Sequence, residues 1–212
     1  MNKIKPLQGR FITFEGIDGA GKSSQVSALV LFLQLKGIAV EHTREPGGCT
    51  LGEQLRELVL HQEMHPDTET LLLFASRRQH LDERIYPALQ ARKWVVCERF
   101  SDSTYAYQVG GRSLPAERFY ALEQWVHPRF SPDLTFLFDI DPAEAFRRLQ
   151  AAETYEKDRF ESLPIEFFEM VREAYLERAR IEHQRIHVID GSKSAEEIRK
   201  EIQAVVTERW FT

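Results

Sequence analysis

Short apolar runs alternate with longer amphipathic segments along the chain. Strands are predicted where β-branched and aromatic residues stand together, at residues 10–15, 38–43, 94–98, 134–139 and 186–190. A turn and then a helical pattern follow each of them. Strands that alternate with helices form parallel sheets covered by helices, so the pattern predicts an α/β fold with a central parallel sheet of about five strands.

The spacing of apolar residues predicts helices between these strands and after the last one. The helical segments are residues 22–36, 51–60, 66–91, 102–109, 115–126, 164–183 and 195–209. Gly37 is expected to end the first helix, and Pro142 to stand in the first turn of a further helix. Residues 151–160 are polar without periodicity, which predicts a loop. No repeat or linker interrupts the pattern, so we expect one domain over residues 1–212.

The composition is that of an ordinary globular protein, with 42% hydrophobic and 29% charged residues. A net charge of −5 disfavours a nucleic-acid-binding protein, which would carry a basic stripe. Two cysteines, Cys49 and Cys97, are too few for a disulfide framework. Residues 1–9 lack the apolar core of a signal peptide, and the longest apolar run, residues 28–33, is too short to span a membrane. We therefore expect a cytoplasmic protein that binds neither nucleic acid nor membranes.

One motif carries the phosphate chemistry. Residues 16–23 read Gly-Ile-Asp-Gly-Ala-Gly-Lys-Ser, which matches the P-loop pattern G-x-x-x-x-G-K-[ST] between a predicted strand and a predicted helix. Glycines let backbone N–H groups surround phosphate oxygens, Lys22 supplies a charge to the β- and γ-phosphates, and Ser23 can bind Mg²⁺. The expected ATP-binding residues are Gly16, Ile17, Asp18, Gly19, Ala20, Gly21, Lys22, Ser23 and Ser24.

The acceptor of the phosphoryl group is indicated by arginines at strand ends. Arg44 and Arg99 each directly follow a predicted strand, in the segments TREPGG (43–48) and ERF (98–100). Ligands of open α/β sheets bind outside the carboxyl ends of the strands, so both arginines should face the crevice of the P-loop. Two guanidinium groups there suit a phosphate monoester, because each can bind phosphate oxygens bidentately.

Two further segments complete a characteristic order of motifs. FASRRQH covers residues 74–80, and STYAYQVGGR covers residues 103–112. Together with the P-loop, TREPGG and ERF, these motifs resemble thymidylate kinases of the bacterial type from Phe11 to about Asp190. The resemblance implies a P-loop NTPase fold with a lid loop at about residues 149–161. It also implies transfer of the γ-phosphoryl group of ATP to dTMP, giving dTDP, with Mg²⁺ and in a homodimer.

The resemblance assigns roles to individual residues. In the acceptor site, Arg44 and Arg99 would hold the phosphate of dTMP, Phe74 would stack on thymine, and Arg77 would bond its carbonyl edge. Thr104, Tyr107 and Gln108 would line the base and the sugar. Asp18 and Glu98 would lie near the metal and its waters, with Ser23 as a further metal ligand. The residues implied to take part in catalysis are Lys22, Arg99, Asp18, Glu98 and Arg159.

The chain departs from the family pattern in three respects. Counting back from Arg77, the stacking phenylalanine of the family falls at Leu73, and Phe74 is one position later, about 100° away on a helix. Phe74 is nevertheless the expected stacking residue, although alone it would more often belong to the core. Glu98 replaces the commoner aspartate, and Val109 replaces a glycine.

The third departure concerns positive charge. The family resemblance implies that enzymes without an arginine in the P-loop carry arginines in the lid, yet residues 149–156 contain no basic residue. Loss of a transition-state arginine costs about 10³-fold or more in rate. Either Lys157 or Arg159 supplies the charge, or the enzyme is slow.

Two other functions remain open from the sequence. A deoxynucleoside kinase shares the P-loop, but its hydroxyl acceptor needs a general base, whereas the anionic acceptor of a nucleotide kinase needs cations such as Arg44 and Arg99. A nucleotide-binding paralogue with little turnover would fit the lid that lacks basic residues. His80 has no neighbouring Cys or His in the sequence, so we expect a buried hydrogen bond rather than a metal ligand.

Overall fold

The computed structural model describes residues 9–151, 159–160 and 162–211. Five strands are formed, β1 (Phe11–Glu15), β2 (Val40–Arg44), β3 (Trp94–Glu98), β4 (Leu134–Asp139) and β5 (Ile186–Asp190). The α-helices are α1 (Lys22–Leu35), α2 (Thr50–His61), α3 (Pro66–His80), α4 (Tyr86–Gln90), α5 (Ser101–Thr104), α6 (Ala116–Val126), α7 (Pro142–Gln150), α8 (Ile165–Ile181) and α9 (Ala195–Trp210). Two π-helical segments are η1 (Leu81–Ile85) and η2 (Tyr105–Gly111).

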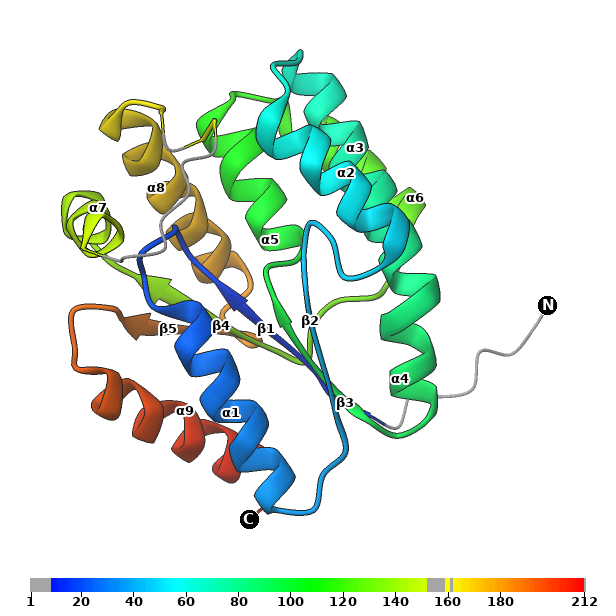
Figure 1. Cartoon of the computed structure of the whole chain (residues 1–212), viewed down its shortest axis with the longest axis vertical. Helices are drawn as coiled ribbons and strands as arrows, with labels where there is room; N and C mark the ends of the chain where they lie inside the picture. Colours follow the sequence, from blue (N-terminus) through cyan, green and yellow to red (C-terminus); the bar gives the residue numbers. More distant parts are fainter. Residues whose placement is uncertain (1–8, 152–158, 161, 212) are drawn as a thin grey trace.

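The strands form one parallel sheet in the order β2-β3-β1-β4-β5, as Figure 1 shows. The predicted parallel α/β sheet is therefore confirmed. Glu98 at the end of β3 is paired with Phe14 of β1 and with Arg44 of β2. The register thus brings the ends of these three strands to one edge of the sheet, where ligands bind in open α/β folds.

Three strands match the predicted bounds, and the second begins two residues later than predicted. Ile38 belongs to the turn that ends α1, because its N–H donates to the carbonyl of Leu33 at 3.0 Å. Gly37, with φ 79°, donates to Gln34 at 2.9 Å, as expected of a glycine that ends a helix. Residues 38 and 39 are thus part of the turn, and pairing with β3 begins at Val40.

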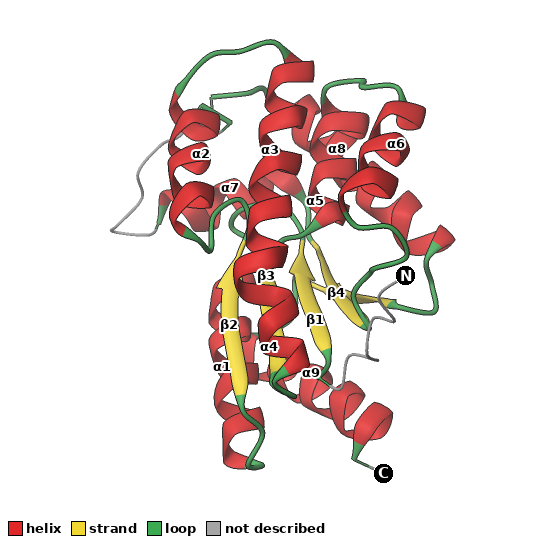
Figure 2. Cartoon of the chain, turned by 90° about the vertical axis from the view of Figure 1, so that its right-hand side faces the viewer, coloured by secondary structure: helices red, strands yellow, loops and turns green. Residues whose placement is uncertain are grey.

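Helices cover both faces of the sheet. Figures 1 and 2 place α1 on one face and α5 and α8 on the other, and α9 packs against α1. Helices α2 and α3 pack on each other beyond the carboxyl ends of the strands (Figure 2). The P-loop and this helical layer therefore enclose the space above β1, β2 and β3.

Two predicted α-helices are interrupted by π-helix. The helix predicted over residues 66–91 consists of α3, η1 and α4. Pro87 has no N–H to donate to the carbonyl of Glu83, and its ring opposes regular α-helical geometry there. The segment predicted over residues 102–109 is α5 followed by η2. A Cβ on Gly110 would lie 2.4 Å from that of Ala174 on α8, so only glycine permits this close packing of η2.

Most of the predicted lid loop lies outside the described residues. Of the loop predicted at residues 151–160, the structure describes residues 151, 159 and 160, so Lys157 lies outside the described residues. Across the described ranges, no helix combines the length and apolar character needed to cross a bilayer.

Candidate active site

An open cavity of about 1490 Å³ lies at the carboxyl edge of β1, β2 and β3. Sites for a single small molecule are usually about 300–1,000 Å³, so this cavity has room for two ligands. It is lined by most of the residues predicted from the sequence, namely Asp18, Gly19, Gly21, Lys22, Ser23, Ser24, Arg44, Arg77, Glu98, Arg99, Thr104, Tyr107 and Gln108. Gly16, Ile17 and Ala20 support the P-loop from within the protein, whereas Phe74 and Arg159 do not line the cavity.

The P-loop is held in a tight turn against neighbouring elements. Gly16, Gly19 and Gly21 have φ values of 133°, 83° and 90°, which side chains disfavour. A Cβ on Gly19 would lie 2.3 Å from the carbonyl oxygen of Ala145 on α7. This packing fixes the loop at the N-terminus of α1, where the positive end of the helix favours an anion.

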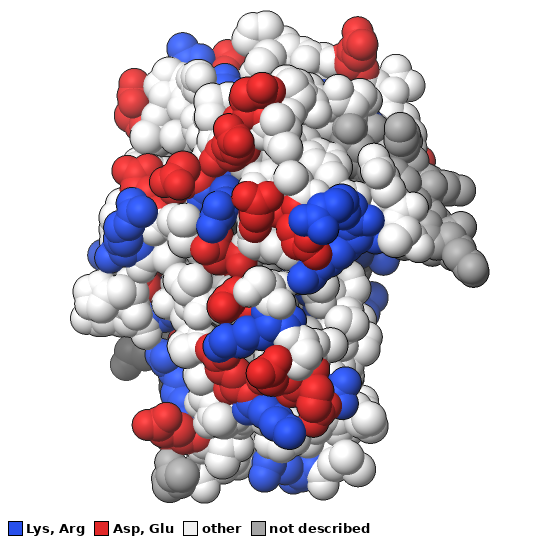
Figure 3. Space-filling model, turned by 90° about the vertical axis from the view of Figure 1, so that its left-hand side faces the viewer, with Lys and Arg blue, Asp and Glu red and all other residues white. Residues whose placement is uncertain are grey.

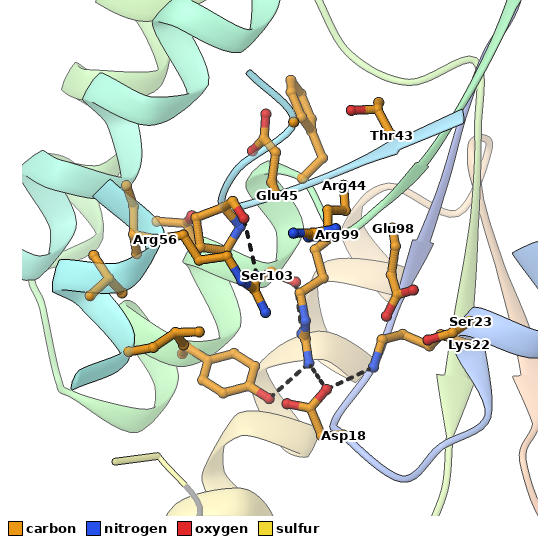
Figure 4. Close-up of a pocket in the computed structure, with 18 of the residues that line it drawn as sticks. Asp18, Lys22, Ser23, Thr43, Arg44, Glu45, Arg56, Glu98, Arg99 and Ser103 are labelled. Atoms are coloured by element: carbon orange, nitrogen blue, oxygen red, sulfur yellow. Dashed lines mark hydrogen bonds and ion pairs between the residues drawn. The ribbon is translucent and has the colours of Figure 1, made fainter. Parts of the chain in front are cut away.

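Asp18 bridges the two main cations of the site. Its Oδ1 accepts from Arg99 Nη2 at 2.6 Å and from Lys22 Nζ at 3.3 Å, as Figure 4 shows. Lys22 also donates to the carbonyl of Ile17 at 2.9 Å. Burial alone would raise the pKa of Asp18, but Arg99 and Lys22 hold it well below its usual range. Burial and repulsion from Arg99 lower the pKa of Lys22.

Arg99 is held at several points. It follows β3 in a left-handed conformation with φ 67°, which turns its side chain into the cavity. Its Nη1 donates to Ser103 Oγ at 3.1 Å and to the hydroxyl of Tyr175 at 3.2 Å, and its Nη2 donates to the hydroxyl of Tyr107 at 3.3 Å. A cation fixed in this way is pre-organised for an anionic ligand.

A buried carboxyl supports these partners from below. Glu15 accepts from the N–H of Phe100 at 2.7 Å, from Ser103 Oγ at 2.5 Å and from the hydroxyl of Tyr175 at 3.3 Å. Burial, together with the nearby Asp102, raises the pKa of Glu15 to about 7. The sequence alone did not reveal this layer, because Glu15 has the place of an ordinary last residue of a strand.

Two further arginines face the same cavity. Arg44 Nη2 donates to Glu53 Oε2 at 2.8 Å, while Glu53 Oε1 accepts from the N–H of Gly48 at 2.8 Å. Arg56 of α2, which the sequence analysis missed, donates to the carbonyl of Pro46 at 3.1 Å. Burial, together with Arg44 and Arg99, lowers the pKa of Arg56. The three arginines therefore form one cluster of cations in the cavity.

Arg77 is the donor at the far wall of the cavity. Its Nε donates to Glu45 Oε2 at 2.8 Å and its Nη2 to Thr104 Oγ1 at 2.9 Å. The guanidinium carbon lies 4.9 Å from the ring centre of Phe74 and 5.0 Å from that of Phe100. Within the described residues, its Nη1 has no hydrogen-bond partner although it is buried.

Phe74 does not reach the cavity, contrary to the expectation that it stacks on a base. Its side chain is only 2% exposed and packs on Phe119, with ring centres 5.7 Å apart. Leu73 lines the cavity instead. Neighbouring positions of a helix point about 100° apart, so when Arg77 faces the cavity the residue four positions earlier faces it too.

Gln108 contributes an acceptor to the same wall. The Nε2 of Gln108 donates to Glu69 Oε1 at 2.7 Å, so the Oε1 of Gln108 points away from Glu69. That oxygen is buried and has no partner in the described part of the chain. Two residues that line the cavity thus each hold one buried polar atom without a partner among the described residues, a donor on Arg77 and an acceptor on Gln108.

Arg159, expected at the reacting phosphates, is bound elsewhere. Its Nε donates to the carbonyl of Val59 at 2.5 Å, and its backbone N–H donates to the carbonyl of Leu60 at 3.2 Å. Its Nη2 pairs with the carboxylate of Glu69. The neighbouring Phe160 lines the cavity. Arg159 thus joins the end of the predicted lid loop to α2 and α3.

Oxygen donors for a divalent cation stand near Lys22. Ser23 and Glu98 lie beside it, with Asp18 below (Figure 4). The part of the chain that the structure describes contains no group of three or more His, Cys, Asp or Glu side chains that could hold a metal. The oxygen donors Ser23, Asp18 and Glu98 are of the kind that binds Mg²⁺ together with waters and phosphate oxygens.

Comparisons with known proteins agree on one family. The profile described as "Thymidylate kinase" matches residues 14–202. The chain is 51% identical to a thymidylate kinase of Methylobacillus flagellatus over 95% of this chain and 98% of that protein. It is 54% identical to one of Nitrosomonas eutropha over 96% and 94% of the two chains. The crystal structure of thymidylate kinase from Ehrlichia chaffeensis superposes with a TM-score of 0.75 at 33% identity, over 94% of this chain and 98% of that one.

Proposed function

The chain belongs to the thymidylate kinase family, and on that premise we propose that it transfers the γ-phosphoryl group of ATP to dTMP, giving ADP and dTDP. The observation that carries this proposal is a single cavity lined by a P-loop lysine, by three arginines and by two residues that each hold a buried polar atom without a partner among the described residues. We propose that residues 1–212 form one domain, because one hydrophobic cluster among the described residues contains side chains from β1 to α9.

The P-loop end of the cavity is the proposed donor site. Residues 16–24 would surround the phosphates of ATP, with Lys22 at the β- and γ-phosphates. Ser23, Asp18 and Glu98 would hold Mg²⁺ directly or through water, and the ion would neutralise charge on the phosphates when bound. Phosphoryl transfer needs little covalent chemistry from the protein, so positioning and positive charge account for the catalysis.

The arginine cluster is the proposed site of the acceptor phosphate. Arg44, Arg56 and Arg99 would bind the phosphate oxygens of dTMP, and those oxygens would replace Asp18 as the partner of Arg99. A phosphate acceptor is already anionic at neutral pH and needs cations rather than a general base. The cluster therefore favours a nucleotide over a nucleoside as the acceptor.

The far wall is the proposed base site. Thymine presents the acceptor O4 next to the N3–H donor, whereas cytosine presents an N4 donor next to an acceptor. Arg77 Nη1 would donate to O4, and Gln108 Oε1 would accept from N3–H. Thr104 and Tyr107 would line the base and sugar, and Leu73, rather than Phe74, would lie against the base.

A coupled assay of ADP release with four acceptors tests this function. We expect dTMP to be preferred over dUMP by about 10–200-fold, because one methyl group in an apolar pocket contributes only about 1–3 kcal/mol. We expect a far larger preference over dCMP, whose base edge inverts the donor and acceptor. Preferred turnover of thymidine would instead identify a nucleoside kinase, and nucleotide binding without ADP release would identify an inactive paralogue.

Replacing Arg159 with alanine is expected to affect stability more than catalysis. The variant loses charged hydrogen bonds to Glu69 and Val59, worth about 1.5–3 kcal/mol together, which corresponds to a fall in Tm of about 3–12 °C for a chain of this size. We expect kcat to stay within about threefold of the parent value, since the guanidinium does not line the cavity.

Arg147→Ala is the matched control for this variant. Arg147 lies on α7 beside the lid, is 73% exposed and pairs only with Glu144 among the contacts that the structure describes. It should change neither the Tm nor kcat. If Arg159→Ala lowered kcat about tenfold with an unchanged KM for dTMP, Arg159 would be a transition-state cation that reaches the phosphates when the lid closes.

We propose a homodimer located in the cytoplasm that binds neither nucleic acid nor membranes. Exposed apolar side chains on α2, α3 and α6 favour self-association, namely Leu51, Leu58, Leu71, Tyr120 and Trp125. On the face drawn in Figure 3, basic and acidic side chains are interspersed rather than gathered into a basic stripe. Light scattering coupled to size-exclusion chromatography should give twice the mass of the chain.

A further inference from the structure

A buried chain of hydrogen bonds approaches the base site from behind. Thr43 Oγ1 lies 2.6 Å from His80 Nε2, and His80 Nδ1 lies 2.9 Å from Glu45 Oε1. Glu45 Oε2 then accepts from Arg77 Nε at 2.8 Å. His80 is fully buried and Glu45 is 4% exposed, so the expectation of a buried hydrogen bond for His80 is confirmed. The phosphoryl transfer itself uses neither residue.

The charge of Glu45 fixes the direction of these bonds. Burial alone would raise the pKa of Glu45, but Arg77 and His80 bring it below its ordinary value, so the carboxyl is ionised. An ionised carboxylate only accepts hydrogen bonds, and therefore Nδ1 of His80 and Nε of Arg77 both donate to it. Each carboxylate oxygen is thus occupied by a different partner.

These contacts determine where Arg77 can donate. The guanidinium is planar, so bonds at Nε to Glu45 and at Nη2 to Thr104 fix its rotation. The rings of Phe74 and Phe100 hold it at 4.9 and 5.0 Å. The position of Nη1, the remaining donor group, then follows from the buried chain.

We propose that Glu45 and His80 are positioning residues that set base selectivity by holding Arg77 Nη1 at the place of thymine O4. This inference rests on the proposed function and adds to it the origin of the selectivity. Without the hydrogen bonds from Glu45 and His80, the guanidinium of Arg77 can rotate and present Nη1 or Nη2 at other positions. A donor that can move no longer distinguishes the acceptor O4 of thymine from the N4 donor of cytosine.

Steady-state kinetics of His80→Leu and Glu45→Gln test this role. Leucine fills much of the volume of His80 without donating, and glutamine offers two donor N–H groups in place of one acceptor oxygen. For each variant, the ratio of kcat/KM for dTMP to that for dCMP should fall about tenfold, the factor that corresponds to one hydrogen bond. The KM for dTMP should rise while the KM for ATP stays unchanged, because the base contact is made in the ground state.

Two variants separate positioning from stability. In His80→Asn, the amide N–H takes the place of Nδ1–H, so most of the selectivity should return even though the Tm falls. Thr13→Val removes another fully buried hydrogen bond, to Thr135 at 2.7 Å inside the sheet, and should lower the Tm without changing the ratio. If His80→Leu does not fold, Thr43→Val provides the test. It removes only the hydrogen bond between Thr43 and His80, the one most distant from Arg77, and should lower the selectivity ratio about threefold.

The outcomes are distinct. A lowered Tm with the parent ratio in both Glu45→Gln and His80→Leu would overturn the proposal and leave these residues a purely structural role. Equal loss of selectivity in Thr13→Val would overturn it as well. A parent protein that does not phosphorylate dTMP would instead contradict the proposed function, irrespective of the variants.

Discussion

Lys22→Ala is expected to lower kcat by about 10³-fold or more, while the Kd for dTMP stays within about threefold. Lys22 stands at the N-terminus of α1, 3% exposed, and the cation is already desolvated and held by Ile17 and Asp18. A desolvated charge at the β- and γ-phosphates stabilises the transition state strongly, because no solvent has to reorganise around it. Rapid-quench measurement of ADP formation, with dTMP binding followed by calorimetry, would separate the two effects.

Lys36→Ala is the matched control for the loss of a lysine. Lys36 is exposed just after the other end of α1, where its ammonium group lies over the rings of Phe32 and Phe211. We expect its kcat to equal that of the parent protein. Near-normal turnover in Lys22→Ala would contradict the assignment of the P-loop as the donor site.

Arg99→Ala should lower kcat/KM for dTMP by about 10³-fold or more, with little change in the KM for ATP. The guanidinium makes contacts with Asp18, Ser103, Tyr107 and Tyr175, so its removal takes the central cation out of the arginine cluster. Arg99→Lys should recover little of this loss, because an ammonium group cannot form two parallel bonds to a phosphate. Initial rates at varied dTMP and fixed saturating ATP give the result.

The backbone at Arg99 calls for a control of its own. Its φ of 67° is strained for a residue with a side chain, and a substitution there acts on the backbone as well as on the site. Arg92 has a similar φ of 63° but is exposed before β3, away from the cavity lining. Arg92→Ala should leave kcat/KM unchanged. A loss shared by both variants would show that the effect is conformational rather than electrostatic.

The sheet could be predicted from the sequence because its signals are local. Runs such as residues 94–98 and 134–139 are mostly apolar, as strands buried on both faces require, and their bounds agree with the structure. The π-helical segments could not be predicted in this way. They depend on how η2 packs on α8, through contacts such as that between Gly110 and Ala174, which lie far apart in the sequence.

The same distinction applies to the site. The P-loop is contiguous, and Arg44 and Arg99 stand at strand ends that any parallel sheet brings together, so their placement followed from the pattern. Arg56 stands within a helix whose spacing does not reveal that it faces the cavity and the loop that contains Pro46. The expected stacking by Phe74 was inconsistent with the structure, because one residue of register on α3 decides between the cavity and the core.

The close approach of the P-loop to α7 limits how this enzyme can evolve. A side chain at position 19 would meet the carbonyl oxygen of Ala145 at 2.3 Å on a backbone with φ 83°, and Ala20 is 1% exposed. A single substitution at either position therefore cannot introduce an arginine without displacing α7 or the loop itself. Gaining a cation at these two positions of the P-loop therefore requires a second change that moves α7 or the loop.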